Sequence, residues 1–201
     1  MFTVRLEPAD RPALRAHLLA LGGEDRRLRF GHIARDVSIE RYVKDIDFER
    51  DAVFGVLSAH GGGRQFDGIT HLALDKDHAE IGVSVLEQAR GHGIGSALVS
   101  RSAVHARNRG IDVLFMQCLS ENGAVKRIAR NLGMKVVTQG PDSEASMSLP
   151  AANALSIMRE IVTDQIALCD ATLREVLLPY ATRVPLHLQS KKERAAAGKY
   201  L

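Results

Sequence analysis

The spacing of apolar positions changes along this chain and predicts a mixed order of strands and helices. In the first 86 residues, alternating or continuous apolar stretches predict strands with two helices between them, and after residue 90 strands and helices alternate. The expected strands are 2–6, 52–59, 69–74, 79–86, 113–118, 134–138 and 145–149, and the expected helices are 10–21, 38–46, 95–108 and 122–132. Strands joined first by hairpins and later by helices predict an α/β fold with one mixed sheet of six to seven strands, flanked by helices.

Local signals suggest where several of these elements begin and end. Asp10, followed by Pro12, is expected to cap the first helix, and Gly22-Gly23 to end it. Ser38 is the expected cap of the second helix. The segment 24–30 between them is strongly charged. The glycines at 61–63 predict a turn between strands.

Beyond Pro150 the pattern changes to one long helix. Apolar residues recur every three, four or seven positions from Leu155 to Tyr180, which predicts a helix within 151–180. At roughly 28 residues it would be about 42 Å long. We therefore divide the chain into a domain of residues 1–150 and a C-terminal helical extension of residues 151–201. The helix either packs on its own domain or pairs with a second copy in a homodimer, and its length favours the dimer. The tail 191–201 is expected to be a frayed basic end.

Composition narrows the class of protein without identifying it. The chain has 201 residues, 45 % of them hydrophobic and 25 % charged, with a net charge of +3. These values exclude a disordered chain, and no apolar run is long enough to span a membrane. The weak net charge, 4 % aromatic residues and absence of tryptophan argue against a nucleic-acid partner. The start of the chain does not resemble a secretion signal, and its two cysteines suit a reducing compartment, so we expect a cytoplasmic protein.

The strongest chemical signal is a glycine-rich turn between a strand and a helix, Arg-Gly-His-Gly-Ile-Gly at residues 90–95. Glycines let the backbone approach a ligand closely, and the positive end of the following helix together with Arg90 favours a phosphate group. The turn lacks the Lys-Ser/Thr ending of a P-loop. It also fails as a dinucleotide fingerprint, because Ser96 stands where glycine or alanine is needed and Asp112 precedes the next strand.

This turn resembles the acetyl-CoA signature of the GNAT family of N-acetyltransferases, with Arg90, Gly93 and Gly95 at its defining positions. Asn122 and the helix ending Leu132-Gly133-Met134 resemble a second segment of that family. More narrowly, residues 27–30 and 79–81 resemble the acetyltransferase domains of bacterial protein-lysine acetyltransferases. The resemblance covers about 150 of the 201 residues.

The resemblance implies an enzyme that moves an acetyl group from acetyl-CoA to a primary amine, by direct attack in a ternary complex. The acceptor is a protein lysine or a small-molecule amine. Glu80 is the expected general base, with a solvated strand glutamate as the alternative. The expected acetyl-CoA contacts are Val85, Leu86, Arg90, Gly91, His92, Gly93, Ile94, Gly95, Ser96 and Asn122. For Val85 and Leu86 we expect backbone N–H groups to bind the pantetheine and polarise the thioester.

Several residues keep two interpretations. Ala129 stands where the family often has a tyrosine that protonates the leaving thiolate, so a non-catalytic acyl-CoA-binding module is the alternative function. His71 is either a second base or an ordinary half-buried histidine. Ser96 either caps its helix or touches a phosphate, whereas Asn122 is expected both to cap its helix and to contact the cosubstrate. Cys118 is expected in the core. The arginines of segment 24–30 either bind an acidic acceptor or face solvent. The histidines show no metal-ligand spacing.

Overall fold

A computed structural model describes residues 2–59 and 64–181 of the chain. The turn expected at 61–63 and the tail at 191–201 lie outside these residues. The strands are β1 (Val4–Arg5), β2 (Ala52–Leu57), β3 (Phe66–Asp75), β4 (His78–Val85), β5 (Val113–Leu119), β6 (Lys135–Gln139) and β7 (Asp142–Ser148). The helices are α1 (Arg11–Leu19), α2 (Gly23–Phe30), α3 (Asp36–Asp45), α4 (Ile94–Asn108), α5 (Gly123–Asn131) and α6 (Ala154–Ala181), with short 3₁₀ turns η1 (Pro8–Asp10) and η2 (Glu87–Ala89).

Within the described residues, seven strands form one sheet in the order β1-β2-β3-β4-β5-β7-β6. The pair β4·β5 is parallel and the other five pairs are antiparallel. The crossover between the two parallel strands runs through α4, as a parallel connection requires. The predicted mixed α/β fold is therefore confirmed.

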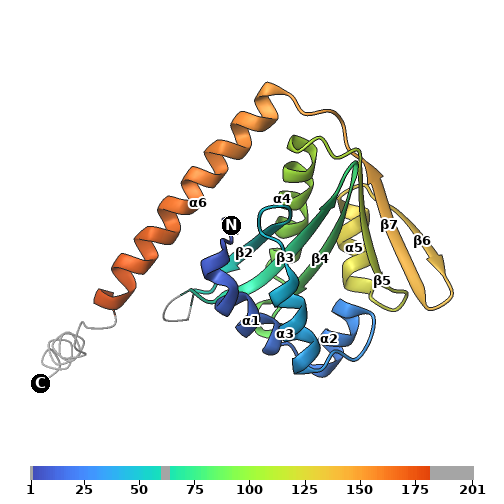
Figure 1. Cartoon of the computed structure of the whole chain (residues 1–201), viewed down its shortest axis with the longest axis horizontal. Coiled ribbons are helices and arrows are strands. Elements are labelled where there is room, and N and C mark those ends of the chain that lie inside the picture. The colour runs from blue at the N-terminus through green and yellow to red at the C-terminus, as the bar shows by residue number, and fades with distance from the viewer. Residues whose placement is uncertain (1, 60–63, 182–201) are drawn as a thin grey trace, which may run out of the picture.

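Helices cover both faces of the sheet and enclose two apolar cores (Figure 1). The first core lies between the sheet and helices α4 and α5, around Ile81, Leu98 and Leu114. The second lies on the opposite face beneath α1 and α3, around Leu14 and Ile39. Strand β4 contributes to the first core with alternate residues only, so its other residues, among them Glu80, Gly82 and Ser84, face the side of α1 and α2.

Helix α6 extends along one side of the molecule and packs against α4 and β1 (Figure 1). Its Ala167 and Ala171 are buried in the second core, so the middle of the helix is part of the packing of the sheet domain. The predicted long helix is confirmed; its stripe beyond Leu173 lies outside the described side chains. Among the described residues, no helix is both long and apolar enough to cross a membrane.

Two local predictions are wrong, and one helix was not predicted. Segment 24–30 is helix α2, which carries Glu24 and Asp25 in its first turn and basic residues in its last, the charge order that a helix dipole favours. Its lack of any buried residue explains why an apolar pattern could not reveal it. The pair Gly22-Gly23 does not end α1, which stops at Leu19; Gly22 is the N-cap of α2. Ser38 caps nothing, because α3 begins at Asp36, with an extended Arg35 before it.

Candidate active site: the fork between β4 and β5

Strands β4 and β5 separate after a short parallel stretch. They pair only from His78 to Glu80 on β4, opposite Val113 to Phe115 on β5, and each then continues for several residues without its partner (Figure 1). Strand β4 stays paired with β3 along its whole length, and β5 with β7, so the sheet itself divides between β4 and β5. The result is a V-shaped opening in the sheet, which we call the fork, and Glu80 is the last paired residue before it.

The fork leaves one edge of β4 free for a ligand. The N–H of Leu86 donates to the carbonyl oxygen of Asp67 at 2.9 Å, which shows that even-numbered residues here direct their N–H groups toward β3. Because N–H directions alternate along a strand, Val83 and Val85 direct theirs into the fork. The backbone of Leu86 is thus occupied by the sheet, whereas those of Val83 and Val85 face the opening.

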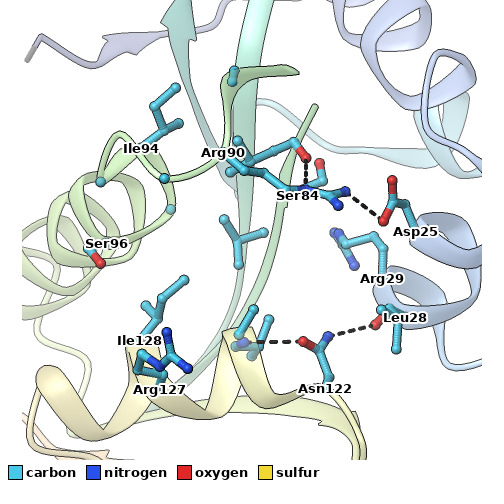
Figure 2. Close-up of a pocket in the computed structure, with 18 of the residues that line it drawn as sticks. Asp25, Leu28, Arg29, Ser84, Arg90, Ile94, Ser96, Asn122, Arg127 and Ile128 are labelled. Atoms are coloured by element: carbon cyan, nitrogen blue, oxygen red, sulfur yellow. Dashed lines mark hydrogen bonds and ion pairs between the residues drawn. The ribbon is translucent and has the colours of Figure 1, made fainter. Parts of the chain in front are cut away.

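A cavity of about 390 Å³ opens along the free end of β4 at the fork (Figure 2). Its walls are β4, the glycine-rich turn, the first turn of α4, helix α5 and helix α2. Of the ten predicted acetyl-CoA contacts, eight line this cavity: Val85, Arg90, Gly91, Gly93, Ile94, Gly95, Ser96 and Asn122. His92 and Leu86 are not among the lining residues, and His92 is exposed on the outer side of the turn.

The turn can follow its path because two of its residues are glycines with positive φ. Gly91 has φ of +80° and Gly93 of +77°, a region that side chains disfavour. Gly93 is the N-cap of α4, so the unpaired N–H groups of the first helical turn open toward the cavity. Gly95 is needed for another reason, because a methyl group there would lie 2.8 Å from Cδ1 of Ile128 on α5. Ser96 lies inside the helix and is not its cap.

Arg90 carries the positive charge of the turn, and helix α2 supplies its partner. Its Nη2 lies 2.6 Å from Oδ1 of Asp25, and its Nε donates to the carbonyl oxygen of Val85 at 3.4 Å. The ion pair joins the turn to α2 across the cavity (Figure 2). Since the Arg90 side chain is still about half exposed, at 47 %, it remains accessible to an anionic ligand.

Asn122 is the cap of α5 and also touches α2. Its Oδ1 accepts from the N–H of Val125 at 3.1 Å, and its Nδ2 donates to the carbonyl oxygen of Leu28 at 3.4 Å (Figure 2). The predicted capping role is therefore confirmed. Both ends of the amide are used by the protein, although the residue lines the cavity.

A second cavity of about 610 Å³ lies on the other side of Glu80. It is lined by Glu80 and Ile81 of β4, by the end of α2, and by residues of β5, β6 and β7. Cys118 is in its wall, and burial raises the pKa of this thiol, so it stays protonated near neutral pH and is a poor nucleophile. An exposed carboxylate at the start of the fork thus faces a cavity distinct from the one beneath the glycine turn.

Two further predicted positions lie elsewhere. Ala129 is fully buried in the core beneath α5 and lines neither cavity. His71 uses both ring nitrogens within the protein, with Nδ1 2.7 Å from the hydroxyl of Tyr42 and Nε2 3.1 Å from Asp51. It also lines neither cavity, so the structure gives it the surroundings of an ordinary half-buried histidine.

Sequence reasoning missed the contribution of α2. Asp25, Leu28 and Arg29 from this helix line the first cavity, as do Ser84 on β4 and Arg127 on α5. An available signal was the resemblance to the GNAT family, in which the region of residues 24–30 lines the acceptor site; it pointed to this segment but not to the first cavity.

A mixed sheet that forks at its parallel pair, with a glycine-rich turn at the open end, fits an acyl-CoA-dependent transferase. The chain belongs to the acetyltransferase (GNAT) family, whose model matches residues 22–134, more than half of its length. Enzymes of this family are N-acetyltransferases that use acetyl-CoA as cosubstrate.

Solved structures share this fold at low sequence identity. The GNAT domain of S. lividans PAT is 18 % identical, with a TM-score of 0.62 over 73 % of this chain and 89 % of that one. A ribosomal-protein-alanine N-acetyltransferase from Brucella melitensis is 17 % identical, with a TM-score of 0.56 over 74 % and 100 %. RimL, a ribosomal alpha-N-protein acetyltransferase in complex with coenzyme A, is 15 % identical, with a TM-score of 0.56 over 75 % and 94 %.

Proposed function

We propose that this enzyme transfers the acetyl group of acetyl-CoA directly to a primary amine, with Glu80 as general base. The observation that carries the proposal is the position of Glu80, the last paired residue of β4, between the fork and the second cavity. The cosubstrate occupies the fork and the amine enters from the second cavity, so the two meet next to this carboxylate.

The residues of the first cavity fit the charged end of acetyl-CoA. The N–H groups at the start of α4 and the side chain of Arg90 bind the pyrophosphate, and the positive φ of Gly91 and Gly93 gives these N–H groups free access. Val83 and Val85 offer the backbone N–H groups that face the fork to the amide chain of the pantetheine. The donors at the start of α4 thus match the diphosphate of acetyl-CoA, and the donors of β4 match the amide groups of its pantetheine chain.

The reaction needs one proton removed and one returned. As the amine nitrogen forms its bond to the acetyl carbon, the carbon–sulfur bond breaks and the amine proton passes to the Glu80 carboxylate. The CoA thiolate takes a proton from water, since Ala129 is buried in the core and no phenol stands at that position, and the protonated Glu80 then gives its proton to the hydroxide left behind. The products are the acetamide and free CoA.

The acceptor we favour is a protein lysine, with a small-molecule amine as the other class. The second cavity supports an extended acceptor because it spans β4, β5, β6 and β7 on one side of the sheet. The protonated thiol of Cys118 argues against an acetyl-cysteine intermediate and supports direct attack.

The test is CoA release from acetyl-CoA with polyamines, amino acids and lysine-bearing protein extracts. We expect turnover with at least one class, and Glu80→Gln should lower it about 100-fold or more at neutral pH. The loss should shrink at high pH, where the amine is deprotonated by solvent. Glu87→Gln is the matched control, because Glu87 lies outside both cavities and its replacement should leave turnover unchanged.

Two outcomes would contradict the proposal. If millimolar acetyl-CoA fails to raise the melting temperature, the fork does not bind the cosubstrate. If acetyl-CoA binds but Glu80→Gln keeps wild-type turnover at every pH, Glu80 is not the base.

We also propose that α6 pairs with the same helix of a second copy. Large apolar side chains remain exposed along it, including Leu155 at 78 %, Leu168 at 59 % and Leu173 at 58 %. Light scattering should give the mass of a dimer, and replacing Leu168 by glutamate should give a monomer that still binds acetyl-CoA. A wild-type monomer at micromolar concentration would contradict this pairing.

A further inference from the structure

The three arginines of α2 have different partners. Arg26 donates to the carbonyl oxygens of Leu19 at 2.6 Å and Leu21 at 3.0 Å, and thereby closes the end of α1. Arg27 is held between Glu24 and Glu121, at 2.7 and 2.6 Å. Arg29 forms no ion pair with any residue in the described part of the chain; its one hydrogen bond there runs from Nη2 to the hydroxyl of Tyr42, at 2.9 Å. The charge of Arg29 is therefore not neutralised by a carboxylate.

The guanidinium of Arg29 lies directly on β4 at Gly82. A methyl group at Gly82 would be 2.1 to 2.4 Å from Nη2, Cζ and Nη1, so only glycine leaves room for the group. Gly82 is two residues beyond Glu80 and on the same face of the strand. The guanidinium thus lies above the backbone at the point where β5 separates.

Arg29 is also the residue common to the two cavities. Among the described residues, it lines both the cavity in the fork and the cavity that contains Glu80. A group bound in one cavity that reacts with a group bound in the other must do so beside this side chain.

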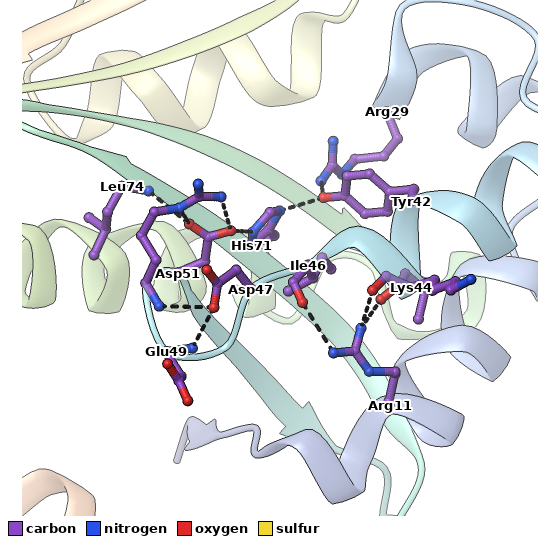
Figure 3. A network of polar contacts seen from close by, with 12 residues as sticks. Arg11, Arg29, Tyr42, Lys44, Ile46, Asp47, Glu49, Asp51, His71 and Leu74 are labelled. Carbon is purple, nitrogen blue, oxygen red and sulfur yellow. Dashed lines mark hydrogen bonds and ion pairs between the residues drawn. The ribbon is translucent and has the colours of Figure 1, made fainter.

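A chain of hydrogen bonds fixes the direction of the guanidinium (Figure 3). Because the Tyr42 hydroxyl accepts from Arg29, its own hydrogen is directed to Nδ1 of His71, 2.7 Å away. The opposite nitrogen of His71 then donates to Asp51 at 3.1 Å. Asp51 is buried, and it also accepts from Arg50 and from the N–H of Leu74.

Asp51 stays ionised at the end of this chain. Burial acts to raise the pKa of Asp51, but the hydrogen bonds from His71, Arg50 and Leu74 outweigh it and hold this pKa well below its usual range. The ionised Asp51 accepts a hydrogen bond at one end of the chain, and this fixes the donor direction of His71, then of Tyr42 and then of Arg29.

Resting on the proposed function, we propose that Arg29 is a catalytic residue that donates to the carbonyl oxygen of the thioester as negative charge develops there. When the amine bonds to the acetyl carbon, the π electrons of the carbonyl move to its oxygen, and they return as the carbon–sulfur bond breaks. An uncompensated cation at the fork, already oriented, stabilises that charge without having to reorganise. Tyr42, His71 and Asp51 are positioning residues that act through Arg29.

The first test is steady-state kinetics of CoA release. Arg29→Met should lower kcat about 100-fold or more, with the KM for acetyl-CoA and for the amine little changed, because the contact strengthens only as charge develops. Tyr42→Phe keeps the ring and removes the hydroxyl, so it should lower kcat by a smaller factor with the same pattern. Arg27→Met is the matched control on the same helix and should leave kcat unchanged.

A second test does not depend on turnover. The ¹³C resonance of acetyl-CoA labelled at its carbonyl carbon should move downfield when the wild-type protein binds it, because a donor polarises the carbonyl group. Arg29→Met should remove that shift and Arg27→Met should keep it. Gly82→Ala retains the arginine but displaces its guanidinium, so it should also remove the shift.

The outcomes separate this proposal from the function on which it rests. If no amine is acetylated but the ¹³C shift of bound acetyl-CoA depends on Arg29, the proposed reaction fails, whereas the contact between Arg29 and the thioester carbonyl stands. If the shift is the same in Arg29→Met as in the wild type, or if Arg29→Met raises only the KM of acidic acceptors, Arg29 does not act on the thioester.

Discussion

Arg90 and Asp25 form an ion pair across the mouth of the cosubstrate cavity, with Nη2 and Oδ1 2.6 Å apart. One residue belongs to the turn that precedes α4 and the other to α2, so the pair joins two walls of the cavity. The carboxylate lies where the phosphates of CoA are expected. On the proposed function, in which Arg90 binds the pyrophosphate of acetyl-CoA, this carboxylate competes with the ligand for the same arginine.

Asp25→Asn should tighten the binding of acetyl-CoA. The pair is partly exposed and worth less than about 1 kcal/mol, so the Kd should fall by a factor of about 2 to 5, and by less at high salt. Titration calorimetry at two ionic strengths measures both effects, and Arg90→Gln should raise the Kd. Weaker binding by Asp25→Asn would mean that Asp25 positions Arg90 for the phosphates.

Gly93→Ala should damage binding as well as stability. Gly93 has φ of +77°, and an alanine there costs about 1–2 kcal/mol and moves the N–H groups that open into the cavity. Gly110, at the other end of α4, has nearly the same φ of +78° and lies outside both cavities. Gly110→Ala should therefore lose similar stability in urea and keep the Kd for acetyl-CoA, whereas Gly93→Ala should raise that Kd at least about 10-fold. Equal Kd values would show that the turn does not hold the ligand.

The sequence was informative where local chemistry decides the structure. The order of strands and helices follows from apolar spacing, and the turn at Gly91 and Gly93 follows from a backbone that only glycine adopts readily. Most predicted contacts line the fork because they are close in the chain. Leu86 is an exception, because the direction of its N–H depends on register with β3, which no local pattern encodes.

The sequence was least informative about contacts between distant segments. Three arginines of one short segment have different roles because the fold gives each a different neighbour. Arg26 meets the end of α1, Arg27 meets Glu121, and Arg29 meets Gly82. Helix α2 itself has no buried residue and thus no apolar signature.

Glu160→Gln should destabilise the docking of α6 on α4. Glu160 accepts from Arg101 at 3.0 Å, from His105 at 2.7 Å and from Asn108 at 2.6 Å, and Arg101 is only 6 % exposed. Arg101 keeps a second carboxylate partner, Asp164, so the substitution weakens the buried network without leaving this cation uncompensated, and we expect a loss of about 1–3 kcal/mol at pH 7. Urea unfolding measures it.

The control is the same substitution in a surface pair. Glu40 pairs with Arg15, and both side chains are about half exposed, so Glu40→Gln should cost less than about 1 kcal/mol. Burial acts to raise the pKa of Glu160, but its hydrogen bonds lower that pKa to about 2. The cost of Glu160→Gln should therefore shrink as the pH falls from 4.5 toward 2. A cost as small as that of Glu40→Gln at pH 7 would contradict a stabilising role for the buried pair.

His17 connects α1 to β3 and to β4, one of the two strands of the fork. Its Nδ1 is 2.8 Å from the carbonyl oxygen of Phe66 on β3, and its Nε2 is 2.9 Å from the hydroxyl of Ser84 on β4. Since a carbonyl can only accept, Nδ1 carries the hydrogen and Nε2 of the neutral ring accepts from Ser84. Burial lowers the pKa of His17 from 6.5 to about 4.

The neutral state of His17 should make stability fall between pH 6.5 and 4. The unfolded chain takes up a proton at His17 below pH 6.5 and the folded protein only near pH 4, so acid favours unfolding in this window and has no such effect above it. The expected loss in the free energy of unfolding is roughly 2–3 kcal/mol between pH 7.5 and 4.5. Urea unfolding across this range measures it, and His17→Gln should flatten the curve although it is less stable at pH 7.5.

The exposed His32 is the control, because His32→Gln should keep the wild-type slope. An equal slope in His17→Gln and in the wild type would show that His17 is not held neutral by the fold.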